Sequence, residues 1–221
     1  AHTLSLLSFT SDPTALADRE LVIEAVVENE QAKLGVFEML DGVVADPAAI
    51  LASNTSSIPI MKLAMATKRP EQVIGVHFFN PVPVMQLVEV VTSLLTSTET
   101  AATCRAFASE VLNKRVVDSQ DRAGFVVNAL LIPYLLSAIR MYESGFASAE
   151  DIDAGMTLGC NHPMGPLALA DLIGLDTTMA VAESLYAEFK EQLYAAPPLL
   201  SRMCDAGLLC RKSGRGFYVY G

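Results

Sequence analysis

The chain has 221 residues, of which 52% are hydrophobic and 18% charged, so it can bury a large core and is not intrinsically disordered. Its 15 basic and 25 acidic residues give a formal net charge of -10, without a long run of Lys or Arg, which argues against nucleic-acid binding. No apolar stretch of about 18 residues is free of charge, so no membrane span is predicted.

The cysteine and histidine content argues against a metal site. The four cysteines form no C-x-x-C pair, and with only three histidines no zinc-ligand spacing can be assembled. Unclustered cysteines in a chain of this length favour buried, reduced thiols and a cytoplasmic protein, and disulfides are the less favoured alternative.

The first half of the chain alternates between short apolar runs and segments of helical periodicity. Strands are predicted over 21–26, within 48–57, and over 73–79, 86–91 and 115–119. Helices are predicted after a cap at Asn29, from Ser57 to about Met65, and over 98–112. Strand and helix in alternation are typical of an α/β domain with a mostly parallel sheet.

The second half is predicted to be helical. Residues 125–145 are apolar nearly all round, and a helix without a polar face is buried on all sides, which favours an interface between two copies. The domain boundary is placed in the polar stretch 119–124, giving domains 1–121 and 122–221. Further helices are expected over 148–158, 165–173, 176–189 and 198–206, and the closing GRGFYVY is expected to form a turn and a short strand.

His77 and Glu89 lie in the otherwise apolar stretch GVHFFNPVPVMQLVEVV. Pro81 and Pro83 interrupt strand pairing, so the flanking strands are expected to fold back on each other. Centred near Pro83, such a hairpin makes positions 77 and 89 opposite neighbours, about 5 Å apart at Cβ. A carboxylate bonded to one ring nitrogen fixes the tautomer and raises the basicity of the other, which suits a general base. The alternative is a buried histidine satisfied by its neighbour, without a role in chemistry.

Polar residues that follow predicted strands are further candidates. Asn54 and Ser56 come after the second strand, where ligands of open α/β sheets gather, although such a cluster also caps helices. Glu28 and Lys33 follow the first strand and could meet a ribose or a phosphate, or be two solvated surface charges.

Two candidates come from the second half. Asn128 is a lone polar residue in GFVVNALLIPY, and it must find a substrate oxygen or a helix neighbour as partner. Lys212 lies in the Gly-rich segment KSGRGFY, where a surface lysine in a turn is the alternative.

Together, these segments resemble the 3-hydroxyacyl-CoA dehydrogenase family over essentially the whole chain, and within it the stand-alone bacterial 3-hydroxybutyryl-CoA dehydrogenases. The matching segments are IEAVVEN, SNTSS, HFFNPVPVMQLVEVV, GFVVNALLIPY, EDIDAGMTLGCNHPMGPLALADLIGLD and KSGRGFY. The resemblance implies a Rossmann-type NAD-binding domain followed by an all-helical domain that forms a homodimer. It also implies an oxidoreductase of fatty-acid metabolism, which interconverts 3-hydroxyacyl-CoA and 3-oxoacyl-CoA.

The resemblance assigns roles to the candidate residues. His77 matches the catalytic base and Glu89 its orienting partner, while Ser56 and Asn128 match the residues that hold the 3-oxygen of the substrate. The positions that match cofactor contacts are Glu28, Lys33, Asn54, Ser56, Asn80 and Lys212.

One feature of the family is missing from the sequence. The family begins with a strand and a G-x-G-x-x-G turn that seats the dinucleotide pyrophosphate, and no such motif occurs here. We therefore expect an N-terminally shortened chain that binds NAD poorly as given, and the choice between NAD and NADP stays open. A non-enzymatic relative and a dehydrogenase of free 3-hydroxy acids are the two rival hypotheses.

Overall fold

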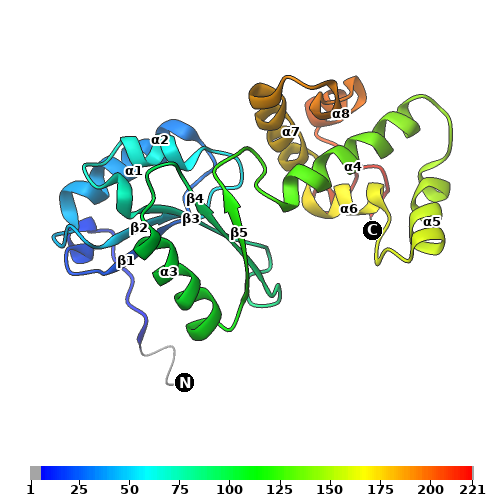
Figure 1. Ribbon diagram of the computed structural model, residues 1–221. Coiled ribbons are helices and arrows are strands. Elements are labelled where there is room, and N and C mark those ends of the chain that lie inside the picture. Colours follow the sequence, from blue (N-terminus) through cyan, green and yellow to red (C-terminus); the bar gives the residue numbers. More distant parts are fainter. Residues whose placement is uncertain (1–5, 221) are drawn as a thin grey trace. The chain divides into compact units, whose positions relative to one another are not determined.

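The computed structural model describes residues 6–220, apart from the side chain of Lys212. The chain divides into two compact units, Ala1–Phe125 and Val126–Gly221. The first is an α/β unit and the second is entirely helical (Figure 1), which confirms the predicted fold class.

The first unit contains a five-stranded sheet with its strands in chain order. Neighbouring strands run parallel except β3 and β4, which are antiparallel, so the predicted mostly parallel sheet and its hairpin are confirmed. The strands are β1 (Leu21–Glu24), β2 (Ile50–Ser53), β3 (Val73–Phe78), β4 (Leu87–Thr92) and β5 (Arg115–Gln120). The first is shorter than the predicted 21–26, because the amide of Val26 donates to the Glu24 side chain at 2.6 Å.

Helices cover both faces of this sheet. They are α1 (Glu30–Val43), α2 (Ile60–Met65) and α3 (Thr98–Ala106), which continues as a π-helical turn η4 (Phe107–Val111), with short 3-10 turns η2 (Pro13–Leu16) and η3 (Pro70–Gln72). Asn29 caps α1 as predicted. The predicted start of α2 at Ser57 is wrong, because the helix begins at Ile60, where the Asp121 carboxylate accepts the amides of Ile60 and Met61.

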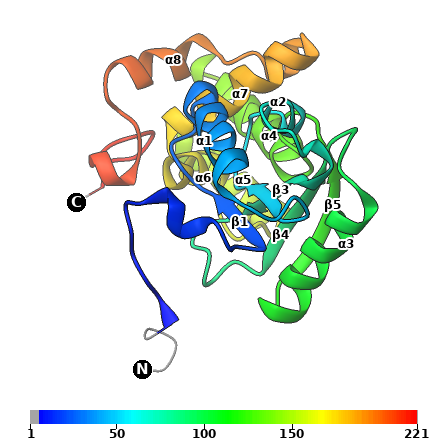
Figure 2. The ribbon, with the colours of Figure 1, turned by 90° about the vertical axis from the view of Figure 1, so that its left-hand side faces the viewer.

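The two faces of the sheet bury separate apolar clusters. Leu51, Val73 and Val91 pack with α1 and α2, whereas Ile74 and Val90 pack with α3. The alternation follows from the two-residue period of side chains along a strand. Figures 1 and 2 show α1 and α2 on one side of the sheet and α3 on the other.

The second unit packs four helices around a long central one. The central helix is α4 (Val127–Glu143), and it contacts α5 (Ala149–Cys160), α6 (Pro166–Ile173), α7 (Leu175–Phe189) and α8 (Pro198–Asp205). Short 3-10 turns follow α7 and α8 as η5 (Gln192–Tyr194) and η6 (Arg211–Ser213). None of the helices within residues 6–220 has both the length and the apolar character needed to cross a bilayer.

The end of the chain departs from the expected strand. Up to residue 220, where the described part of the chain stops, it forms only isolated bridges, between Cys210 and Arg215 and between Arg215 and Val219. The reason is the buried carboxylate of Asp171, which accepts the amides of Phe217 and Tyr218, each at 2.9 Å. These two amides therefore donate to a side chain and not to the carbonyl groups of a neighbouring strand.

Candidate active site

The hairpin of β3 and β4 brings His77 and Glu89 together. The two residues are paired in register, as predicted, and His77 Nδ1 lies 2.8 Å from Glu89 Oε2. Both are buried, His77 with 4% and Glu89 with 0% of its surface exposed. Side chains alternate between the two faces along a strand, and an even number of positions separates His77 from Val73 and Glu89 from Val91. Both residues therefore face the side of the sheet that α2 covers.

Ser56 completes a chain of three side chains. It follows β2, which runs parallel to β3, and its Oγ lies 3.0 Å from His77 Nε2. The rings of Phe79 and Phe125 lie 4.6 and 5.5 Å from the imidazole, centroid to centroid. The rings of Phe79 and Phe125 thus shield the imidazole from water, while Nε2 faces the half-buried hydroxyl of Ser56.

This arrangement suits transfer of one proton at His77 Nε2. A carboxylate can only accept, so Nδ1 carries the hydrogen toward Glu89 in the neutral ring, and this tautomer is assigned from the chemistry of the pair. Nε2 then has an electron pair that accepts the hydrogen bond of the Ser56 hydroxyl and can take up a proton in its place. The positive charge that results would lie next to the fully buried Glu89 carboxylate, which stabilises it.

Glu28 holds the loop that carries Ser56. Its Oε1 accepts the hydroxyl of Thr55 at 2.5 Å and the amides of Ser56 and Ser57 at 2.9 and 3.0 Å. Burial raises the pKa of the Glu28 carboxyl, but these hydrogen bonds and the charge of Lys33 outweigh it and bring the pKa below its ordinary value. The carboxylate is therefore ionised and fixes the backbone at Ser56.

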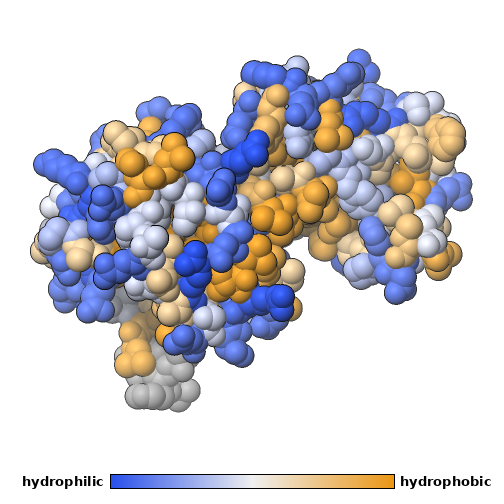
Figure 3. All heavy atoms as spheres, viewed as in Figure 1, coloured by the Kyte–Doolittle hydropathy of each residue, from blue (hydrophilic) through white to orange (hydrophobic). Residues whose placement is uncertain are grey.

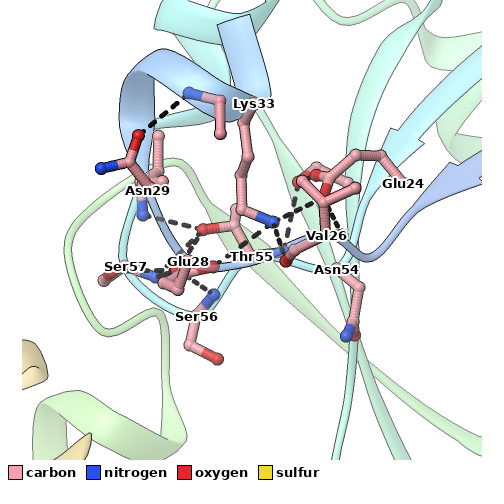
Figure 4. A network of polar contacts seen from close by, with 12 residues as sticks. Glu24, Val26, Glu28, Asn29, Lys33, Asn54, Thr55, Ser56 and Ser57 are labelled. Atoms are coloured by element: carbon pink, nitrogen blue, oxygen red, sulfur yellow. Dashed lines mark hydrogen bonds and ion pairs between the residues drawn. The ribbon is translucent and has the colours of Figure 1, made fainter. Parts of the chain in front are cut away.

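Lys33 is a buried cation, with only 1% of its side chain exposed. Its Nζ lies 2.6 Å from Glu24 Oε1 and 3.4 Å from Glu28 Oε2 (Figure 4). Lysine in the first turn of a helix points back toward the helix start, which here faces the end of β1. The alternative of two solvated surface charges is thus wrong for Lys33.

Asn54 and Asn80 also follow strands at this edge of the sheet. Asn54 is half-buried, and its Oδ1 accepts the amide of Phe78 at 2.8 Å, which ties the ends of β2 and β3 together. Asn80 is exposed and precedes Pro81. With Glu28 and Ser56, these residues form a polar rim along the carboxyl ends of β1, β2 and β3.

The remaining two candidates lie in the second unit. Asn128 is half-buried near the start of α4, and the side chain of Lys212 lies outside the described residues. The roles of both residues stay predictions.

Comparison with known proteins identifies the chain. The model of the 3-hydroxyacyl-CoA dehydrogenase NAD-binding domain matches residues 1–122, and that of the family's C-terminal domain matches residues 124–220. The chain belongs to the 3-hydroxyacyl-CoA dehydrogenase family. The two matches correspond to the α/β part and the helical part of the fold, in that order.

Named relatives of this family support the assignment. The chain is 61% identical to a 3-hydroxybutyryl-CoA dehydrogenase of Mycobacterium tuberculosis, over 99% of this chain and 77% of the relative. A crystal structure of M. tuberculosis FadB2 has a TM-score of 0.97 at 61% identity and covers 99% of this chain and 76% of that one. The (S)-3-hydroxybutyryl-CoA dehydrogenase PaaH1 of Ralstonia eutropha has a TM-score of 0.92 at 48% identity, over 96% and 74%.

The rim of the sheet suits the NAD that this family's first domain binds. Ser56, Asn54 and Asn80 offer a hydroxyl and two amides at the ends of parallel strands, where nucleotides bind in doubly wound folds. Lys33 fits less directly, because its ammonium is already held by two carboxylates. Within the described residues, no group of three or more His, Cys, Asp or Glu side chains could hold a metal ion.

Three residues of this candidate site were not predicted from the sequence. Glu24, Ser53 and Thr55 are buried and join Lys33 and Glu28 in one hydrogen-bonded network. The sequence did hold a signal for Glu24, which is an acidic residue at the end of an apolar strand. A carboxylate buried there needs partners, and these could have been sought among the nearby polar residues.

The Glu28 carboxylate makes the stability of the Ser56 loop depend on pH. The pKa of Glu28 is lower in the folded protein than the ordinary value of 4.5. Its contribution to the free energy of unfolding is therefore complete above pH 4.5 and is lost as the pH falls through the pKa of the folded state. We expect the urea midpoint of unfolding to decrease more between pH 6 and pH 3 in the natural protein than in Glu28→Gln. Equal decreases in the two proteins would contradict this role of Glu28.

Proposed function

We propose that the protein interconverts 3-hydroxyacyl-CoA and 3-oxoacyl-CoA, and that short acyl chains are its preferred substrates. The proposal of 3-hydroxybutyryl-CoA and acetoacetyl-CoA as the substrate pair rests on the names of the similar proteins. The single observation that supports the chemistry best is the hydrogen-bonded chain from Ser56 Oγ through His77 to Glu89.

In the oxidation direction, His77 Nε2 takes the proton of the 3-hydroxyl group as the C–H bond at the same carbon gives up a hydride. When bound, NAD supplies the acceptor for that hydride, and its reduced form supplies the donor for the reverse reaction. Glu89 stabilises the imidazolium that forms, and in the reverse direction His77 returns the proton to the 3-oxygen.

Ser56 is proposed to donate a hydrogen bond to the 3-oxygen while charge develops on it. Its Oγ and His77 Nε2 are 3.0 Å apart, so one oxygen atom can lie within hydrogen-bond reach of both. Asn128 is proposed as the second donor. In comparable sites each such donor is worth about 2.7–4 kcal/mol of transition-state stabilisation.

The cofactor is proposed to lie along the polar rim of the sheet. Asn54, Ser56 and Asn80 would contact the cofactor directly. Glu28 and Lys33 would lie beneath it and hold the loop that carries Ser56. Lys212 is proposed as a contact from the second unit.

We propose further that the protein is a homodimer that associates through its helical unit. Large apolar side chains on this unit are exposed in the single chain, among them Leu130 at 73%, Phe146 at 78% and Leu158 at 86%. Apolar areas on the surface of this unit are visible in Figure 3. A cytoplasmic location is proposed on the basis of the four cysteines, which are free thiols. The predicted burial of these thiols is wrong for Cys160, which is exposed, and holds fully for Cys104.

The substrate proposal is tested by following NADH oxidation by the complete natural protein. We expect turnover with acetoacetyl-CoA, slower turnover with a long-chain 3-oxoacyl-CoA, and none with free acetoacetate. Turnover of the free acid at the same rate would favour a dehydrogenase of 3-hydroxy acids. No turnover of any substrate by protein that binds NADH would favour a non-enzymatic relative.

A further inference from the structure

Glu24, the last residue of β1, is a buried carboxylate with 0% of its side chain exposed. Its Oε1 accepts Lys33 Nζ and the amide of Val26, each at 2.6 Å. Its Oε2 accepts the hydroxyl of Ser53, also at 2.6 Å. A carboxylate removed from water in this way is stable only with such partners, so Glu24 and the groups around it depend on each other.

One route leads from Glu24 through Lys33 to the Ser56 loop. Lys33 Nζ lies between the two carboxylates, at 2.6 Å from Glu24 and 3.4 Å from Glu28. The oxygen of Glu28 that faces Lys33 is Oε2, whereas Oε1 binds the amides of Ser56 and Ser57. The position of the ammonium therefore sets the position of the carboxylate that holds the loop.

A second route leads through Ser53 to the same loop. Ser53 Oγ donates to Glu24 Oε2 and accepts the amide of Thr55 at 3.2 Å. The Thr55 hydroxyl in turn donates to Glu28 Oε1. Figure 4 shows Glu24, Lys33, Glu28 and the loop residues in one connected set of contacts. Both routes therefore end at the backbone next to Ser56.

We propose that Glu24 is a positioning residue, which acts through Lys33 and Ser53 to hold the Ser56 hydroxyl on His77 Nε2. The inference rests on the proposed function, because it needs Ser56 and His77 to take part in the reaction. Within the described residues, every buried side-chain nitrogen and oxygen has a hydrogen-bond partner, and Glu24 is the acceptor for both Lys33 and Ser53.

A merely structural ion pair is the alternative, and the same unit contains a matched example. Asp41 and Arg69 form a pair with 10% and 11% of their side chains exposed, and their Oδ1 and Nε atoms are 2.9 Å apart. Arg69 also binds carbonyl groups at the end of α1, away from the Ser56 loop. Loss of this pair should lower stability without a change in the turnover of folded protein.

The test is a double-mutant cycle in the complete natural protein, with acetoacetyl-CoA and NADH both saturating. Glu24→Gln keeps the size of the side chain and removes its charge, and we expect kcat to fall about 10- to 100-fold, as for a misplaced catalytic group. In a Ser56→Ala background, Glu24→Gln should lower kcat less than about threefold, because the hydroxyl that Glu24 positions is already absent. Asp41→Asn should lower the melting temperature and leave kcat unchanged.

The outcomes separate this inference from the proposed function. If Ser56→Ala alone leaves kcat unchanged, the proposed role of Ser56 is wrong and the inference is overturned with it. If Ser56→Ala lowers kcat but Glu24→Gln has no effect, or the same effect in both backgrounds, only the inference is overturned. Should Glu24→Gln fail to fold, Ser53→Ala interrupts the second route without a change of charge. It should lower kcat about threefold in the natural background and not in Ser56→Ala.

Discussion

Replacing His77 by alanine is expected to lower kcat for acetoacetyl-CoA reduction by about 10²- to 10⁴-fold, the usual contribution of general acid–base catalysis. The loss follows from the position of Nε2, which is the proton donor in the proposed reaction and lies 3.0 Å from Ser56 Oγ. Stopped-flow measurement of NADH oxidation at saturating substrate gives the rate. The circular dichroism spectrum should stay that of the natural protein.

His162 supplies the matched control for this prediction. It is an exposed histidine of the helical unit, with Nδ1 at 3.2 Å from the hydroxyl of Tyr134. His162→Ala should keep kcat within about threefold of the natural value, as surface substitutions usually do. The role assigned to His77 is wrong if correctly folded His77→Ala also keeps kcat within about threefold of the natural value.

Asp171→Ala is expected to destabilise the helical unit by about 3 kcal/mol, since three half-buried donors lose their acceptor and a fully buried donor would cost about 1–3 kcal/mol. Asp171 is fully buried and accepts the amides of Phe217 and Tyr218 and the hydroxyl of Tyr220, each at 2.9 Å. Burial, together with the hydrogen bond to Asp171, raises the pKa of Tyr220 to about 12, so this hydroxyl remains a donor at neutral pH.

Hydrogen exchange in the intact chain reports this effect directly. In Asp171→Ala, the amides of Phe217 and Tyr218 should lose their protection before the amides of α4. Glu183→Ala removes an exposed acidic residue from α7 and should change neither the exchange nor the melting temperature appreciably. Protection of both amides at the natural level in Asp171→Ala would show that this carboxylate does not hold the end of the chain.

Periodicity and turn chemistry were enough to predict the sheet and the hairpin of β3 and β4. Two prolines between apolar runs determined where the chain reverses, and the two-residue period then placed His77 opposite Glu89. The cap at Asn29 was likewise a local signal, because its side chain bonds a residue only three positions away.

Features that depend on distant residues could not be predicted in this way. Lysine is ordinarily solvated, and Lys33 is buried only because Glu24 and Glu28 meet it from the end of β1. The closing segment has the aromatic and branched residues of a strand, but Asp171, 46 positions before Phe217, takes its amides. Tertiary contacts override local preference at both places.

The central claim is that His77 moves the proton with the support of the Glu89 charge, and the pH profile of kcat/KM for Glu89→Gln tests it most directly. Glutamine can still accept the Nδ1 hydrogen, so the change removes the charge and keeps the hydrogen bond. The account predicts a rate about 10²-fold lower and a profile of altered shape, because the imidazolium loses its buried counter-charge. A Glu89→Gln enzyme with the natural rate and an unchanged profile would contradict it.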